Sequence, residues 1–156
     1  MRSSSRGVTL IEMMMVVVIV GLLAGITFPS VTSGIDSIRL SSASDAIASF
    51  LNAGLNRAER RQQLIEITVL KSERSLTMRS SEPGFMRKIE LPDGVTIVAI
   101  LPEGPDEKEA GRRFVFYPGG VVPRVGLEIA NRRGVRRIVR VDPITGAPQI
   151  ERVEAQ

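Results

Sequence analysis

The sequence predicts an α+β fold, in which a long N-terminal α-helix packs on a C-terminal antiparallel β-sheet domain. Three observations support this prediction. An uninterrupted apolar run extends from Met13 to Phe28, apolar residues then recur at helical spacing as far as Leu64, and from Ile65 onward the period changes to two. We therefore expect four segments: residues 1–7, 8–28, 29–64 and 65–156.

The segment 8–28 is long enough to cross a membrane. At a rise of ~1.5 Å per residue, a helix of this length spans about 31 Å, roughly one bilayer core. Arg2 and Arg6 precede the segment, and the other basic residues begin at Arg39. The positive-inside rule then places the N-terminus in the cytoplasm and the C-terminal domain outside it. The nearest signal-peptidase-like site, Leu23-Ala24-Gly25, is a poor match to a secretory signal.

A single carboxylate, that of Glu12, lies near the start of this apolar segment. A lone charged side chain in hydrocarbon costs several kcal/mol, so an ionisable group within a span is a functional candidate. The alternative is that Glu12 is tolerated near the lipid headgroups of a simple anchor.

The leader and the residues after it carry a specific resemblance. Ser5-Arg6-Gly7, followed by Val8-Thr9-Leu10-Ile11-Glu12, resembles the type III signal of type IV pilins and type II secretion pseudopilins. The resemblance implies that a prepilin peptidase cleaves after Gly7 and methylates the new N-terminus at Val8. Most members have Phe at the methylated position, so Val8 departs from the pattern.

Glu12 and Pro29 also match places where pilins commonly carry these residue types. In a filament, the mature amine of one protomer enters an apolar helix bundle, where an unpaired charge costs more than a pair. Glu12 of a neighbour would supply the opposite charge and fix the axial register. Pro29 lacks a backbone N–H and would kink or locally melt the helix. The alternative for Pro29 is the plain end of a transmembrane segment.

The segment 29–64 continues the helix with an amphipathic pattern. Gly34 and the Ser/Ala stretch Ser41–Ser44 lower its helix propensity, so we expect a break or bend between Thr32 and Ser44. The apolar positions are Ile35, Ile38, Ile47, Phe50, Leu51, Leu55, Ala58 and Leu64.

Residues 65–156 alternate between short strand patterns and turn residues. Consecutive strands with short links favour an antiparallel sheet, packed on the apolar face of the helix. The expected strands are 65–70, 76–78, 89–91, 95–101, 113–117, 125–130 and 137–142.

A second block sharpens the resemblance. Phe114-Val115-Phe116-Tyr117-Pro118-Gly119-Gly120, then Pro123 and Gly126-Leu127-Glu128-Ile129, resembles the GspH/FimT branch of minor pseudopilins and pilins with a globular β-sheet domain. The resemblance implies a pilin-like fold. It also implies one of two machines: a periplasmic pseudopilus that exports folded proteins, or a pilus or competence filament in which some subunits bind DNA.

Composition argues against an enzyme. The chain has no Cys and no His, so it lacks a thiol nucleophile, the commonest general base and the commonest metal ligand. A Ser–Lys pair exists only as the neighbours Lys71 and Ser72 in an expected turn. We expect no catalytic residues, no cofactor and no metal.

A group of arginines follows residue 111. Between Arg112 and Arg140 there are eight Arg and one acidic residue, Glu128, a local charge of +7. Such a patch could neutralise phosphates. The candidate residues for an anionic partner are Arg132, Arg133, Arg136, Arg137 and Arg140.

Two observations weaken DNA as that partner. No aromatic residue follows Tyr117 to stack on bases. DNA-binding competence members carry a Gly-Arg-x-Arg motif, where this chain has Gly146-Ala147-Pro148-Gln149. The alternative is a solvated hairpin whose arginines meet acidic groups of neighbouring subunits or lipid phosphates.

The sequence thus predicts a structural minor pseudopilin of a type II secretion system, anchored once in the inner membrane, with a periplasmic domain that joins the pseudopilus. The expected partners are prepilin peptidase, other major and minor pseudopilins, and inner-membrane lipid. The alternative is a minor pilin of a type IV pilus or competence system, with DNA as a partner.

Overall fold

The computed structural model describes residues 8–104 and 111–153. The chain divides into two compact units, Met1–Ile35 (unit 1) and Asp36–Gln156 (unit 2), which are described separately. The leader, Gly7 included, lies outside the described residues.

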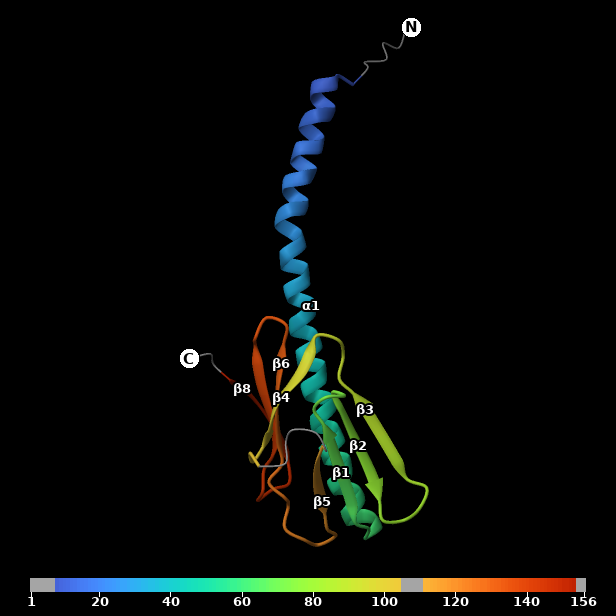
Figure 1. The fold of residues 1–156 in the computed structure, drawn as a ribbon. Coiled ribbons are helices and arrows are strands. Elements are labelled where there is room, and N and C mark those ends of the chain that lie inside the picture. The colour runs from blue at the N-terminus through green and yellow to red at the C-terminus, as the bar shows by residue number, and fades with distance from the viewer. Residues whose placement is uncertain (1–7, 105–110, 154–156) are drawn as a thin grey trace. The chain divides into compact units, whose positions relative to one another are not determined.

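One helix, α1, extends from Leu10 to Arg61 and contributes to both units (Figure 1). The expected break between Thr32 and Ser44 is not observed, because α1 is continuous through these residues, and a bend there stays a prediction. In unit 2 the low propensity of the Ser-rich stretch is offset by burial, and the Ser44 hydroxyl donates a hydrogen bond to the Leu40 carbonyl (2.8 Å).

Helix α1 ends three residues before the expected boundary at Leu64. Gln62 has a φ of 51°, a left-handed conformation typical of a helix C-terminus. The Gln63 N–H then donates to the carbonyl of Ala58 (3.3 Å), which satisfies one of the last helical carbonyls.

The strands of unit 2 form two four-stranded antiparallel sheets in the described residues, whereas the sequence suggested one sheet. The first sheet has the order β3-β2-β1-β5 and the second the order β4-β6-β7-β8. The strands are β1 (Ile65–Leu70), β2 (Ser75–Ser80), β3 (Met86–Glu90), β4 (Val95–Leu101), β5 (Arg112–Phe116), β6 (Gly126–Asn131), β7 (Arg136–Val141) and β8 (Pro148–Val153). The sequence analysis anticipated the first seven and missed β8.

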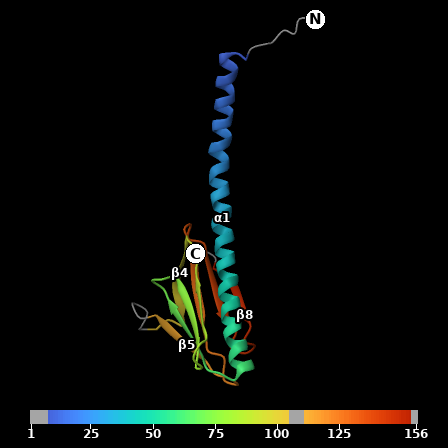
Figure 2. The same cartoon turned by 90° about the vertical axis from the view of Figure 1, so that its right-hand side faces the viewer.

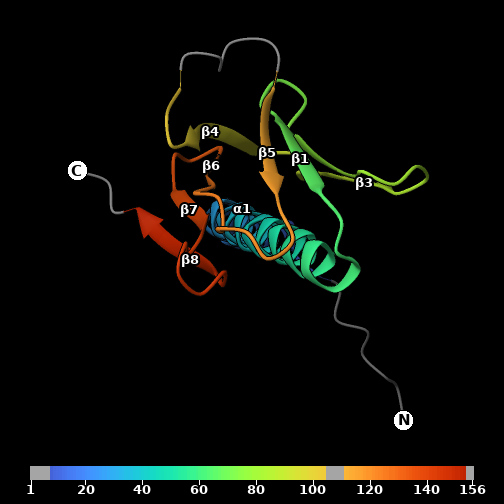
Figure 3. The same cartoon turned by 90° about the horizontal axis from the view of Figure 1, so that it is seen from below.

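Long-range pairing explains the division into two sheets. Strand β1 pairs with both β2 and the distant β5, while β4 turns away and pairs with β6. The strands of both sheets lie alongside the part of α1 that belongs to unit 2 (Figure 2). Seen from below in Figure 3, β1 and β5 stand on one side of this part of α1, and β7 and β8 on another.

The core of unit 2 lies between this part of α1 and the two sheets. Leu40, Ile47 and Leu51 of α1 are at most 1% exposed, and they join buried residues from both sheets in one hydrophobic cluster. The helix approaches the first sheet closely at Gly54. A Cβ there would lie 3.0 Å from the Ile67 Cδ1 atom and 3.1 Å from the Phe116 Cε2 atom. Only glycine permits this approach without displacing those side chains.

Two cationic side chains cover the free edge of β4. Lys71 donates to the carbonyl of Val98, where the strand has a bulge. Arg112 donates to the carbonyls of Ile100 and Pro102. These side chains connect the two sheets and block further strand pairing at this edge. The Lys71 ammonium is thereby engaged in a structural contact.

Candidate processing and assembly site

The apolar segment of unit 1 exposes its side chains. The large hydrophobic residues from Val8 to Ile26 are between 48% and 82% exposed. Among the described residues, α1 alone is long and apolar enough to cross a membrane. A helix that is apolar on all sides requires a nonaqueous environment, either lipid or other helices.

Thr9 and Glu12 define the start of α1. The Glu12 backbone N–H donates to Thr9 Oγ1 (3.3 Å), and the Met13 N–H donates to the Thr9 carbonyl (3.2 Å). Thr9 is therefore the N-cap, and Glu12 occupies the third helical position, the spacing of a capping box. The positive end of the helix dipole also favours a carboxylate in this first turn. Sequence reasoning missed this second role of Glu12, although Thr-x-x-Glu before an apolar run is its signature.

Val8 lies two residues before the first residue of α1, outside regular structure, and is 66% exposed. Gly7 falls outside the described residues, so the bond between them is located only by its sequence position.

Other residues of unit 1 bear on helix packing. Thr27 Oγ1 donates to the Leu23 carbonyl (2.8 Å), which satisfies the hydroxyl inside an apolar segment. A Cβ at Gly21 or Gly25 would meet nothing within 4 Å. Their four-residue spacing, which the sequence analysis did not single out, matches the small-x-x-x-small pattern that lets apolar helices approach closely. Pro29 lies within α1, and a kink there stays a prediction.

The five candidate arginines lie on or beside the β6–β7 hairpin, but they do not form one free cationic surface. Arg136 pairs with Glu128 (3.1 Å), and Arg140 pairs with Glu151. Because strand residues alternate between faces, Arg136 and Arg140 share one face of the second sheet while Arg137 lies on the other.

The remaining three arginines contact other parts of unit 2. Arg133 lies 3.8 Å from the Asp36 carboxylate, and Arg137 donates to Ser41 Oγ (3.1 Å). Arg132 packs over the turn at Gly94, where a Cβ would lie 3.0 Å from its Nε atom. Of the five arginines, Arg133, Arg136 and Arg140 thus have carboxylate partners within the chain itself. These partners lower the positive electrostatic field that an external anion would meet. Strand register and tertiary packing bring these partners together, so the sequence alone did not reveal them.

The described residues contain no cluster of three or more His, Cys, Asp or Glu side chains that could hold a metal ion. The chemistry of the site therefore rests on one carboxylate, one helix N-terminus and an apolar helix surface. This set can pair with an amine and pack against lipid or helices.

Comparisons with known proteins agree with this arrangement. The family described as "Prokaryotic N-terminal methylation motif" matches residues 2–28. The fold is similar to that of the minor pseudopilin EpsH from the type 2 secretion system of Vibrio cholerae, with a TM-score of 0.56 and 12% sequence identity. The similarity covers 73% of this chain and 97% of that protein. No curated protein matches the sequence.

The match to residues 2–28 contains Gly7, Val8 and Glu12, the residues that the leader resemblance had singled out. The structural similarity extends well beyond that motif, since it covers 73% of this chain. The chain therefore combines the N-terminal methylation motif of prepilin-type proteins with a pilin-like α+β fold of the kind found in a minor pseudopilin.

Proposed function

We propose that this chain is a structural, non-enzymatic minor pseudopilin of a type II secretion system. The observation that carries the proposal is the union of a methylation motif, an exposed apolar helix and a domain whose fold is similar to that of a minor pseudopilin. The subunit is held once in the inner membrane, N-terminus in the cytoplasm, and its unit 2 lies in the periplasm.

Maturation is the first step of the proposed function. Prepilin peptidase cleaves between Gly7 and Val8 and methylates the Val8 amine. Cleavage removes Arg2 and Arg6, the charges ahead of the span, and leaves an amine next to an apolar helix. The Gly7→Val variant should keep its leader. A mature-sized product of that variant, detected by mass spectrometry, would refute the cleavage site.

Assembly is the second step. The mature helix leaves the bilayer and packs among the helices of other pseudopilins. Burial of its amine is costly unless a carboxylate pairs with it, and Glu12 of a neighbour supplies that carboxylate. The exposed apolar surface from Val8 to Ile26 supplies the contact area in both settings, lipid and filament.

The alternative machine is a type IV pilus or a competence filament, which would use the same motif and fold. A subunit that binds DNA there would need a free cationic surface, and the partners of Arg133, Arg136 and Arg140 argue against one at the hairpin.

Deletion of the gene, scored for both protein secretion and DNA uptake, separates the two machines. We expect exoproteins to accumulate in the periplasm, and the wild-type copy but not Glu12→Ala to restore export. Normal export with a loss of piliation or DNA uptake would assign the subunit to a pilus instead. Binding of the full-length chain to duplex DNA that weakens with salt and is lost with Arg132→Glu and Arg136→Glu would support the same reassignment.

A further inference from the structure

The second sheet carries a groove on the face opposite the core. Leu101, Gly126, Arg140 and Gln149 are directly paired across β4, β6, β7 and β8, so they form one row on one face. Their sequence neighbours Leu127 and Val139 point the other way and are fully buried in the core. The row is therefore on the outer face of the sheet, and a cavity of about 430 Å³ lies over it.

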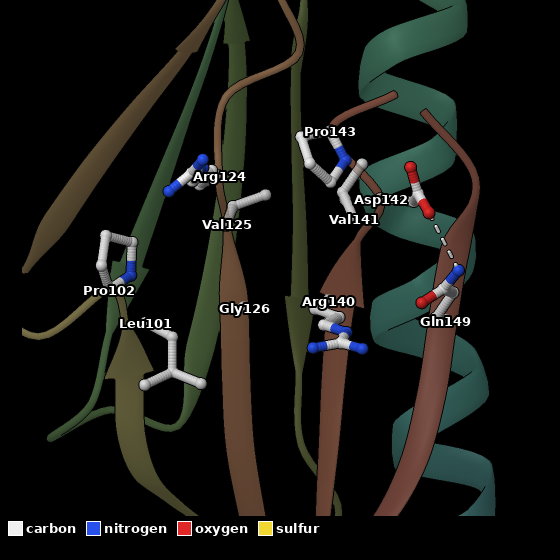
Figure 4. A pocket seen from close by; sticks show the side chains of 10 residues that line it. All are labelled: Leu101, Pro102, Arg124, Val125, Gly126, Arg140, Val141, Asp142, Pro143 and Gln149. Atoms are coloured by element: carbon white, nitrogen blue, oxygen red, sulfur yellow. Dashed lines mark hydrogen bonds between the residues drawn. The ribbon is translucent and has the colours of Figure 1, made fainter. Parts of the chain in front are cut away.

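Gly126 creates the depression in this row. Figure 4 shows it between the side chains of Leu101 and Arg140, with nothing projecting from its own position. A Cβ at Gly126 would lie 3.3 Å from the Leu101 Cβ and 3.4 Å from the Arg140 Cβ. The strands are thus closely paired beneath an open space, and the floor is mainly apolar. Pro102 and Pro143 add apolar surface to the lining.

The lining of the groove contains two arginines, Arg124 and Arg140, and one acidic residue, Asp142. Arg124, at its rim, is exposed and has no ion pair or hydrogen bond within residues 8–104 and 111–153. Arg140 is held by Glu151, but a guanidinium has five N–H donors and keeps some available.

Asp142 forms no ion pair with Arg124 within the described ranges and has other partners. Its carboxylate accepts hydrogen bonds from the N–H groups of Ile144 (2.8 Å) and Thr145 (3.0 Å) and from the Gln149 side chain (3.1 Å), the last of which is drawn in Figure 4. The backbone hydrogen bonds from Thr145 and Ile144 lower the pKa of Asp142, so it stays ionised but turned into its own β7–β8 turn.

Exposed apolar side chains continue the surface beyond the groove. Ile144, next to Pro143 in the lining, is 91% exposed, and Val121 in the β5–β6 connection is 88% exposed. The two loops meet, because a Cβ at Gly146 would lie 3.6 Å from the Val122 Cγ2 atom. Exposed apolar residues beside a lined groove are typical of a protein-binding surface.

The shape and chemistry favour a polypeptide over a nucleic acid. The row spans three strand spacings of ~4.8 Å, about 14 Å, which matches roughly four residues of an extended chain. Nucleic-acid interfaces are more polar and much more positively charged than this apolar floor, and the lining has no aromatic residue to stack on a base.

We propose that this groove binds an extended polypeptide segment that carries one Asp or Glu beside aliphatic or prolyl residues. The carboxylate pairs with Arg124, supported by Arg140, and the apolar residues lie over Leu101, Gly126 and Pro143. This inference goes beyond the proposed function, because such binding requires neither filament assembly nor Glu12.

A positional-scanning octapeptide library, acetylated and amidated so that only side chains supply carboxylates, tests the proposal on the full-length protein in detergent micelles. We expect selection of Asp or Glu at one position with aliphatic or prolyl neighbours. Affinity for the best peptide should fall at least tenfold with Arg124→Gln, and equally when its acidic residue becomes the amide. Arg113→Gln, an exposed arginine of the first sheet, is the matched control and should bind normally.

Three outcomes would overturn the proposal. These are a library that selects no acidic position, an Arg124→Gln protein that binds as tightly as wild type, or a DNA duplex that competes for the site in an Arg124-dependent manner. Because Arg124 is exposed, its substitution should leave the circular dichroism spectrum unchanged. The Glu12→Ala protein should bind the peptide normally, so failure of pseudopilus assembly and failure of this site are distinguishable.

Discussion

The apolar helix of unit 1 and the buried helix face of unit 2 contain similar residues in opposite environments. Leu22 and Val17 are 63% and 67% exposed, whereas Leu40 and Leu51 are 1% and 0% exposed. Burial of a leucine stabilises a fold by about 1.5–3 kcal/mol, so the residues of unit 2 hold a domain together. The residues of unit 1 make no such contribution in isolation, and their apolar surface is available to lipid or to other helices.

The comparison also separates two uses of glycine. Gly21 and Gly25 in unit 1 have open space around them, while Gly54 in unit 2 lies against the side chains of the first sheet. Gly21 and Gly25 leave room for a helix of another molecule, whereas Gly54 makes room for side chains of the same chain.

The largest expected effect on stability comes from a substitution in the buried face of α1 in unit 2. Leu51→Ala should lower the free energy of unfolding of unit 2 by about 2–5 kcal/mol, because it leaves a cavity beneath both sheets. Leu22→Ala, the matched control, should change it by less than about 0.5 kcal/mol. Urea unfolding of the full chain in detergent, followed by the β-sheet signal in circular dichroism, measures both. Equal losses would contradict the separation of the units.

A substitution of glycine sharpens the same contrast. Gly54→Val should destabilise unit 2 by about 1–3 kcal/mol, because the added carbons overlap the ends of Ile67 and Phe116. Gly21→Val, where nothing lies within 4 Å, should leave the unfolding curve of unit 2 unchanged. A stable Gly54→Val protein would show that α1 packs less closely on the first sheet than the structure indicates.

Removal of the Arg112 hydrogen bonds at the edge of β4 should have a smaller effect on stability. Arg112→Met keeps the aliphatic stem but removes the donors to the carbonyls of Ile100 and Pro102. We expect a loss of about 1 kcal/mol in unfolding free energy and more self-association, because an unprotected strand edge can pair with another chain. Light scattering with Arg113→Met as the control checks this, and equal scattering from both variants would remove the protective role.

The smallest effect concerns the turn before β8. Hydrogen bonds from Thr145 and Ile144 lower the pKa of Asp142, so its charged form stabilises unit 2 at neutral pH, and this stabilisation is lost as pH falls through the lowered pKa. Asp142→Asn should therefore be less stable than wild type at pH 7, and the difference should shrink below about pH 4. Asp45→Asn, on the exposed side of α1, is the control. A stability difference for Asp142→Asn that does not change with pH would contradict a stabilising role for the Asp142 charge.

Most of the fold could be predicted from local pattern, but the sheet arrangement could not. Helical and two-residue periodicity located α1 and β1 to β7 to within a few residues. Strand β8 was missed because Pro148 begins it and only Ile150 and Val153 among its residues are large and apolar. That composition suits an edge strand, where proline is tolerated at the first position. The split into two sheets depends on the pairing of β1 with β5, which local pattern cannot show.

The candidate functional residues also fall into two groups, those that a local sequence motif reveals and those that depend on the tertiary fold. Gly7, Val8 and Glu12 follow a fixed linear motif, so sequence was sufficient to single them out. The partners of the arginines and the row that forms the groove depend on strand register. One local signal for the groove was present in the expected strand 125–130. An isolated glycine in a strand pattern, here Gly126, indicates a bulge or a close approach of backbone.

The measurement that tests the central claim most directly is the incorporation of Glu12→Gln into pseudopilus filaments, released from the periplasm by opening the outer membrane and compared with the inner-membrane fraction. This variant keeps a side chain compatible with the capping box and loses only the charge. We predict a mature, membrane-bound protein with normal unfolding of unit 2 that is absent from filaments. Normal incorporation of Glu12→Gln, together with failure of Thr9→Ala, would show that the residue acts through helix capping and would contradict charge pairing in assembly.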